Sequence, residues 1–244
     1  AQDRFLGQWP NLYNLETGAV LHAHEGKDAA ALLPFLQRLK AARCPLKAVA
    51  LDLSEAYRRA VCQVFGSRVD VVHDPYHVVA LANFAIDETR RDLVRELTGE
   101  ERSVLKGSRF LLLKGLERLT DSSLERLAQL MELNTPLYQA YLLKEELRTF
   151  WSLPDEQAGT AFLDQWTEQA RATGLHHFQR LADTLDGHRP GLLAYFRHRI
   201  TTGPLEGLNN KIKVLKRQPY GFRDMAYFKL RLYFIHEAAA SFPG

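Results

Sequence analysis

A single acid heads a strongly basic stretch near the end of the sequence. Glu206 is the only acidic residue between positions 200 and 223, where five basic residues occur: Lys211, Lys213, Lys216, Arg217 and Arg223. Four residues of this stretch are spaced so that a helix would place them on one face: Glu206, Asn210, Lys213 and Arg217. A carboxylate can hold a divalent cation, and cations behind it can hold a phosphate chain. The structural alternative is a solvated basic face whose first acid interacts with the helix dipole.

Two further acids lie where an α/β sheet collects its ligands. Asp52 lies at the C-terminal end of the apolar run 46–53, which is typical of a strand buried on both faces. Asp74 follows the run 68–73, which is typical of a second strand. Acids that converge there repel each other unless a cation joins them. A pair of Mg²⁺ ions about 4 Å apart can activate a water or a 3′-hydroxyl for attack on a phosphodiester. Alternatively, Asp52 caps the next helix and Asp74 forms a turn before Pro75. We favour the functional interpretation for Asp52, because an ionised acid inside a core run needs a reason.

The elements around these acids follow from periodicity, caps and turns. A hairpin is predicted over 11–24, and a helix over 27–42 with Pro34 in its first turn. Ser54 caps and Gly66 ends a helix between the two strands, which makes a βαβ unit with parallel strands. From 75 to about 201 nearly everything is amphipathic helix, with four aromatic residues expected in its core: Tyr138, Tyr141, Trp151 and Trp166. A basic helix begins near Pro204, and a last helix covers 224–240.

The composition of the chain is that of an ordinary globular protein. It has 244 residues, of which 46% are hydrophobic and 25% charged, and a formal net charge of +3. No apolar run approaches the length of a membrane span and the N-terminus lacks a signal-peptide pattern, so no membrane role is expected. Cys44 and Cys62 form no CxxC pattern, so we expect a reducing, cytoplasmic setting.

Several long motifs resemble one family. The stretches LETGAVLHAHEGKDAAALLPFLQRL, AVALDLSEAYRRAV, VVHDPYHVVALANFAIDETRR and GPLEGLNNKIKVLKRQPYGFRDMAYFKLRLYF resemble the catalytic region of the DDE transposases of the ISL-three type, which bacterial insertion sequences encode. The resemblance covers nearly the whole chain from about residue 11. Its most specific parts are D-x-x-H followed by N-x-A-x-D-x-x-R-R, and E-G-x-N-N-K-I-K-x-x-K-R-x-x-x-G-F.

This resemblance implies a helix-rich α/β (α+β) fold, an RNase H-like mixed sheet with a large all-helical insertion. The catalytic core would comprise 1–95 and 200–244, and the insertion 96–199. In the family, a strand that carries an acid and a second long strand precede the LETG hairpin. Only fourteen residues precede Leu15 here, too few for both strands at about 3.3 Å per residue. We therefore expect a truncated N-terminal strand, without the family's zinc-binding and helix-turn-helix regions.

The resemblance also implies three catalytic acids. Asp52 matches the second and Glu206 the third. Asp3 is a candidate for the first, shifted by a deletion; alternatively, the first ten residues are unrelated sequence that replaces a lost strand. Asp74 is the other candidate for the remaining acid. Asp74 and His77, in HDPYH, match an adjoining motif that we expect to brace the site and contact DNA, with a capped or core histidine as the alternative for His77.

The function that follows is metal-dependent DNA cleavage and strand transfer of an insertion sequence. Mg²⁺ or Mn²⁺ would be held by Asp52, Glu206 and Asp74. Contacts to DNA are expected from eight residues: His77, Asn209, Asn210, Lys211, Lys213, Lys216, Arg217 and Arg223. One alternative is a truncated, inactive remnant that only binds DNA, and a weaker one is a helical scaffold with no nucleic-acid role. The expected partner is the DNA of insertion-sequence ends in the bacterial cytoplasm at the nucleoid, and a homodimer would be a natural way to join two ends.

Overall fold

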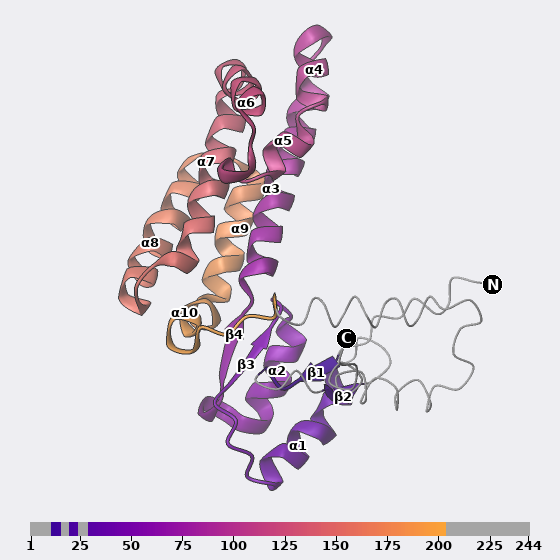
Figure 1. Cartoon of the computed structure of the whole chain (residues 1–244), viewed down its shortest axis with the longest axis vertical. Helices are drawn as coiled ribbons and strands as arrows, with labels where there is room; N and C mark the ends of the chain where they lie inside the picture. Colours follow the sequence, from indigo (N-terminus) through magenta and orange to yellow (C-terminus); the bar gives the residue numbers. More distant parts are fainter. Residues whose placement is uncertain (1–10, 16–19, 24–28, 204–244) are drawn as a thin grey trace, which may run out of the picture. The chain divides into compact units, whose positions relative to one another are not determined.

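The structure is a computed structural model that describes residues 11–15, 20–23 and 29–203 (Figure 1). The chain forms two compact units. The strand unit comprises Ala1–Val71 and Ile200–Gly244, and the helical unit comprises Val72–Arg199. The division falls inside strand β4, Asp70–His73.

The strand unit contains the hairpin and the βαβ segment that the sequence predicts. β1 (Asn11–Tyr13) pairs antiparallel with β2 (Val20–Ala23), so that Leu12 lies opposite His22. Three elements then lead to β4: β3 (Ala48–Leu51), α2 (Glu55–Phe65) and η3 (Gly66–Arg68). β3 and β4 pair in a small parallel sheet. Both predictions are confirmed.

Two helices supply the core of the strand unit. η2 (Ala29–Leu32) leads into α1 (Leu33–Ala41), with Pro34 in its first turn as predicted, and α1 packs against α2. The buried cluster between them comprises Leu32, Leu36, Ala60, Val61, Val64 and Val69. Lys40 Nζ donates a hydrogen bond of 2.6 Å to the carbonyl of Val64 in the last turn of α2. Gly66 ends α2 as predicted, with a φ of +62° that glycine adopts at least cost.

The prediction that the first strand is buried on both faces is wrong. All four residues of β3 are half-buried, and the strand is shorter than the apolar run 46–53. In the part of the chain that the structure describes, β3 has one paired neighbour, β4. A strand with one partner does not reach the burial of a central strand in a parallel sheet, which helices cover on both faces.

The helical unit is the nearly continuous run of helices that the periodicity predicts. Its elements are α3 (Pro75–Glu96), α4 (Gly99–Lys106), α5 (Arg109–Leu113), η4 (Leu116–Arg118), α6 (Asp121–Leu133), α7 (Thr135–Thr149), η5 (Phe150–Ser152), α8 (Glu156–Ala172), α9 (His176–Gly187) and α10 (Arg189–His198). α3 packs against α7 and α9, and α8 packs against α9 (Figure 1). Side chains of Thr120, Asn134 and Asp155 cap α6, α7 and α8.

Three of the four expected core aromatics are at least half-buried. Trp166 is fully buried and its indole N–H donates to the carbonyl of Leu143 at 2.9 Å. Tyr141 is buried and Trp151 is half-buried. The prediction for Tyr138 is wrong, because this residue is 44% exposed on the outer face of α7. The periodicity of α7 identifies an apolar face without showing how far neighbouring helices extend over it.

The helix-rich α+β class is confirmed, while the RNase H-like sheet stays a prediction. The domain division at residues 95 and 96 also stays a prediction; by its contacts, α3 packs with helices of the helical unit. Among the described residues, no helix combines the length and the apolar character that crossing a membrane requires.

Candidate functional site

Asp52 lies directly after β3, at the carboxyl end of the strand as predicted. Its Oδ1 accepts a hydrogen bond of 3.1 Å from the backbone N–H of Ser54, the N-cap residue of α2. The carboxylate therefore sits at the positive end of a helix, which stabilises its charge. Asp52 is exposed, so the expectation that it lies inside a core run is wrong, and burial gives no reason to favour a functional role. What remains is a water-accessible carboxylate at a strand end.

Asp74 follows β4 and is the N-cap of α3. Its Oδ1 accepts a hydrogen bond of 2.8 Å from the backbone N–H of Tyr76, and Pro75 occupies the first turn. The residue is 1% exposed. This arrangement satisfies one of the N–H groups that a helix start leaves unpaired, so Asp74 has a structural role at this turn. Its predicted catalytic and metal-binding roles stay predictions.

A pair of histidines, one fully buried and the other half-buried, adjoins Asp74, and no motif predicted their pairing. His73 Nε2 lies 3.1 Å from Nδ1 of His188, and the ring centroids are 4.8 Å apart in an edge-to-face arrangement. His73 is fully buried. Gly191 packs so closely that a Cβ there would lie 2.4 Å from the His73 ring. His73 stands in the VVHDPYH motif, but spacing gives no sign of a partner 115 residues away.

His77 lies in the first turn of α3 and is exposed. Its ring contacts the edge of the Tyr76 ring at 5.6 Å between centroids, and Tyr76 is 62% exposed. The alternative of a core histidine is therefore wrong. An exposed imidazole and phenol at a helix N-terminus suit contact with a polyanion, and the predicted DNA contact of His77 stays a prediction.

The motif N-x-A-x-D-x-x-R-R forms a buried ion cluster. Asp87 Oδ1 accepts from Arg90 Nη2 at 2.7 Å and from Arg90 Nε at 3.0 Å. Asp87 Oδ2 lies 3.0 Å from Arg91 Nη2 and 3.2 Å from Arg109 Nε. Asp87 and Arg90 are 6% and 7% exposed. These motif residues therefore tie α3 to α5, a role that spacing alone did not reveal.

All the other predicted site residues lie outside the described residues: Asp3, Glu206, Asn209, Asn210, Lys211, Lys213, Lys216, Arg217 and Arg223. Within 11–15, 20–23 and 29–203, no three side chains of His, Cys, Asp or Glu are grouped closely enough to hold a metal ion. The predicted site draws on Glu206, and so the metal centre stays a prediction.

Comparison with known proteins identifies the family. A family model described as a transposase, the DDE transposase of the ISL3 type, matches residues 6–232. The transposase for insertion sequence element IS1001 of Bordetella parapertussis is 34% identical over 229 residues, which are 92% of this chain and 55% of the relative. The transposase for insertion sequence element IS1557 of Mycobacterium tuberculosis is 31% identical over 233 residues, 86% of this chain and 52% of the relative.

The chain thus spans about half the length of these curated relatives. An ATP-dependent protease of Lactococcus lactis is 42% identical over only 65 residues, 27% of this chain and 21% of the relative, which is too short to bear on the family. No solved structure matches the chain. Because the family model covers nearly the whole chain, and a transposase relative is 34% identical over 92% of it, the chain belongs to the ISL3-type DDE transposase family.

Proposed function

We propose that this chain carries the catalytic core of a transposase that cleaves DNA at the ends of an insertion sequence and joins the released ends to a target strand. The observation that carries the proposal is Asp52, an exposed carboxylate at the carboxyl end of β3 in a chain of this family. Ligands in open α/β sheets collect at that edge. The chain's relatives are named as transposases of insertion sequence elements.

The donor set suits Mg²⁺ or Mn²⁺. Carboxylate oxygens are the ligands that these hard cations prefer, and Asp52 presents its carboxylate to water. Asp52 and Glu206 would hold the metal, with Asp3 or Asp74 as the third acid. Asp74 fits less well than Asp52, because it is buried and already caps α3. We assign Asp74 mainly to bracing the turn between β4 and α3.

Bound divalent ions would supply activation of a water or a 3′-hydroxyl and stabilisation of the leaving oxygen. The side chains of the chain itself would position the DNA. Six residues near Glu206 would contact it: Asn209, Asn210, Lys211, Lys213, Lys216 and Arg217. Arg223 and the exposed His77 would add contacts to the phosphate backbone. A homodimer on DNA would bring two element ends together.

The test is cleavage of a supercoiled plasmid that carries the ends of the element encoding the chain. Wild-type protein should nick it in Mg²⁺ or Mn²⁺ and not in EDTA. Glu206→Gln should abolish nicking while DNA binding persists. Glu125→Gln, which removes an exposed acid of α6, is the matched control and should nick like wild type. Undiminished nicking by the Glu206→Gln variant would show that the assignment is wrong.

The second candidate is a protein that binds DNA without cutting it. The position of Asp74 favours it, because an acid committed to a helix cap reduces the donors available for a metal. This candidate predicts DNA binding that weakens steeply as salt rises, with no metal-dependent nicking by the wild-type chain. Robust nicking by wild type would eliminate it.

A further inference from the structure

A second basic stretch lies in the helical unit, far in sequence from the one near Glu206. The segment 102–118, here called the basic arm, runs from α4 through α5 to η4. It holds five basic residues, Arg102, Lys106, Arg109, Lys114 and Arg118. Its one acid is Glu117. The arm is therefore rich in cations, although two acids, Glu100 and Glu101, precede it in the first turn of α4.

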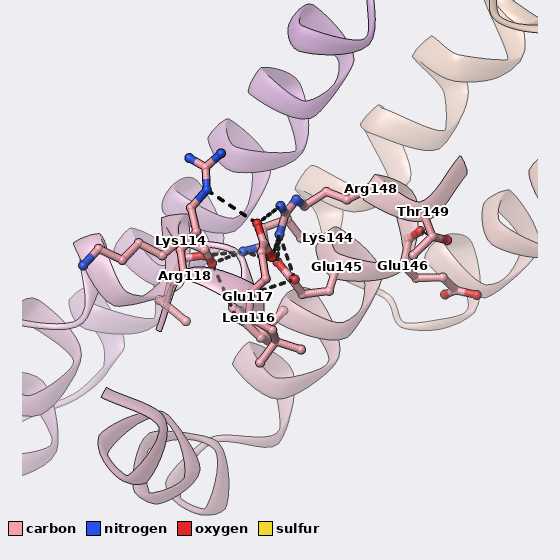
Figure 2. Close-up of polar contacts among 11 residues, drawn as sticks. Lys114, Leu116, Glu117, Arg118, Lys144, Glu145, Glu146, Arg148 and Thr149 are labelled. Atoms are coloured by element: carbon pink, nitrogen blue, oxygen red, sulfur yellow. Dashed lines mark hydrogen bonds and ion pairs between the residues drawn. The ribbon is translucent and has the colours of Figure 1, made fainter. Parts of the chain in front are cut away.

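Several cations of the basic arm face water. Arg102 and Lys114 are exposed. Figure 2 shows the ammonium group of Lys114 pointing away from the neighbouring polar cluster. The side chain of Arg118 is 79% exposed, with its Nε 3.6 Å from Glu117. Arg109 is half-exposed and reaches Asp87 with one nitrogen.

A sixth cation reaches the basic arm from α6, which contacts both α4 and α5. A Cβ on Gly107 would lie 3.0 Å from Nη2 of Arg126, so this guanidinium lies at the junction of α4 and α5. The acids of α6 are spaced by four and seven residues and so share another helical face: Asp121, Glu125 and Glu132. Arg126 therefore adds positive charge to the arm, and the acids of its own helix lie on another face.

The one acid of the basic arm is neutralised from α7. Arg148 Nη2 lies 2.5 Å from Oε1 of Glu117, and Arg148 Nη1 lies 3.1 Å from Oε2 (Figure 2). The hydrogen bond with Arg148 lowers the pKa of Glu117 to about 2, so the carboxylate is ionised and paired at neutral pH. Glu117 thus offsets little of the charge that the arm presents to a ligand.

The backbone of the basic arm is fixed to α7 by a buried lysine. Lys144 is fully buried, and its Nζ donates to the carbonyls of Leu112 at 2.7 Å and Lys114 at 2.9 Å. These are carbonyls that the C-terminus of α5 leaves without helical partners. The backbone N–H of Leu116 donates to Oε2 of Glu145 at 3.1 Å. The chain is so close to α7 here that a Cβ on Gly115 would lie 1.7 Å from Arg148 Nη1.

An exposed aromatic ring lies among the cations. Phe110 is 74% exposed, and the guanidinium carbon of Arg109 lies 5.8 Å from its ring centroid. In proteins that bind single-stranded nucleic acid, aromatic rings beside cations are surfaces on which unpaired bases stack. A second copy of the chain is a poorer occupant. In a two-fold dimer the arm would face its own copy, so like charges would meet, and lysine is depleted in protein interfaces.

The geometry points to the basic arm and Arg126 as a second DNA-contacting surface, through which the helical unit holds the phosphate backbone of DNA. This inference rests on the proposed function as a DNA-processing enzyme. Because α7 holds residues 112–117 of the arm in place, binding to this part of the arm carries little ordering cost. The contacts are to phosphates, so the surface binds DNA of any sequence.

The test is the salt dependence of binding to a short labelled duplex of arbitrary sequence, measured by fluorescence anisotropy. The arm variant combines Arg102→Gln, Lys114→Gln and Arg126→Gln. Each lost phosphate contact lowers the slope of log K against log salt by about 0.9, so the slope should fall by about 2.7. The ratio of the wild-type affinity to the affinity of the arm variant should then be about 40-fold smaller at about 200 mM salt than at about 50 mM salt.

The matched control removes three exposed arginines elsewhere, Arg43→Gln, Arg68→Gln and Arg180→Gln. Far-UV circular dichroism and Tm verify that both variants fold. A smaller slope in the arm variant alone supports the inference. A slope equal to that of wild type, or equal to that of the control, overturns it, as does a change in sedimentation with DNA binding intact, which would indicate self-association.

The outcomes separate this inference from the proposed function. If Glu206→Gln abolishes nicking but the arm variant binds like wild type, the arm inference falls and the catalytic proposal stands. If the slope of log K against log salt is smaller for the arm variant while Glu206→Gln still nicks DNA, the inference about the arm is supported. The assignment of Glu206 as a catalytic residue is then wrong.

Discussion

The buried ion pair of Asp87 and Arg90 predicts a large, local loss of stability when one partner is removed. Both residues are less than a tenth exposed, and two guanidinium nitrogens of Arg90 bond the same carboxylate oxygen. Asp87→Asn would leave the Arg90 charge buried without its counter-ion. Such a break costs about 3–5 kcal/mol. We expect the lower end, about 3 kcal/mol, because the amide oxygen of Asn can still accept one hydrogen bond.

The neighbouring pair of Glu88 and Arg91 is the matched control. The Arg91 side chain is 46% exposed, so Glu88→Gln should cost about 0–1 kcal/mol. Replacing both buried partners by apolar residues, as Asp87→Val with Arg90→Met, leaves no buried unpaired charge. That double variant should recover most of the stability that Asp87→Asn loses.

The assay is urea unfolding followed by tryptophan fluorescence. In a Trp9→Phe background the signal comes from Trp151 and Trp166, both in the helical unit. With a urea m-value of about 2 kcal/mol/M, the loss predicted for Asp87→Asn lowers the midpoint by about 1.5 M. If Asp87→Asn lowers the urea midpoint no more than Glu88→Gln does, the reasoning is refuted. Such a result would show that burial does not make the ion pair of Asp87 and Arg90 more costly to break.

Three further predictions concern the substitution of single residues in the helical unit. Gly191→Ala should lower Tm sharply because its Cβ meets the ring of His73, and adding His73→Ala should restore part of the loss by opening space; an equally unstable double variant would contradict this. Burial raises the pKa of Glu146, so its ionised form is penalised in the folded state; Glu146→Gln should raise Tm at pH 7, with the gain vanishing below the ordinary Glu pKa of 4.5. The Arg148 hydrogen bond lowers the pKa of Glu117 to about 2, so its stabilisation is present above pH 4.5 and is lost as pH falls through about 2; the Tm difference between wild type and Glu117→Gln should shrink over that window.

Local signals in the sequence predicted the elements well. The cap position of Ser54 and the helix end at Gly66 each depend on a few neighbouring residues, and the βαβ segment lies where these signals place it. The two strands of the hairpin also lie within the predicted range 11–24. The helices from 75 onward follow in the same way from apolar spacing. In each case the interactions that decide the structure are near in sequence.

Burial could not be predicted as well, because it depends on what other elements cover. Asp52 lies after a strand whose residues are only half-buried, and Tyr138 lies on a face that no neighbour covers fully. The pairing of His73 with His188 and of Lys144 with the carbonyl of Leu112 joins positions 115 and 32 residues apart. Residue spacing along one helix carries no information on such contacts.

The candidate site was predictable to the extent that it depends on motifs. The resemblance identified the family, which the comparisons confirm, and it singled out Asp52 and Asp74. The resemblance did not distinguish catalytic residues from structural ones. Asp74 caps a helix, and Asp87 of the longer motif is the centre of a buried ion cluster. Identical spacing is compatible with both roles, and only the contacts distinguish them.

The central claim is that Asp52 and Glu206 bind the same divalent cations, and iron-directed cleavage of the chain tests it most directly. Fe²⁺ in place of Mg²⁺, with ascorbate and peroxide, produces hydroxyl radicals that cut the backbone next to the bound ion. The account predicts two groups of cuts, one around Asp52 and one around Glu206, both suppressed by excess Mg²⁺ and both lost in Asp52→Asn. Cuts near only one of the two acids, or a pattern that Asp52→Asn leaves unchanged, would contradict it.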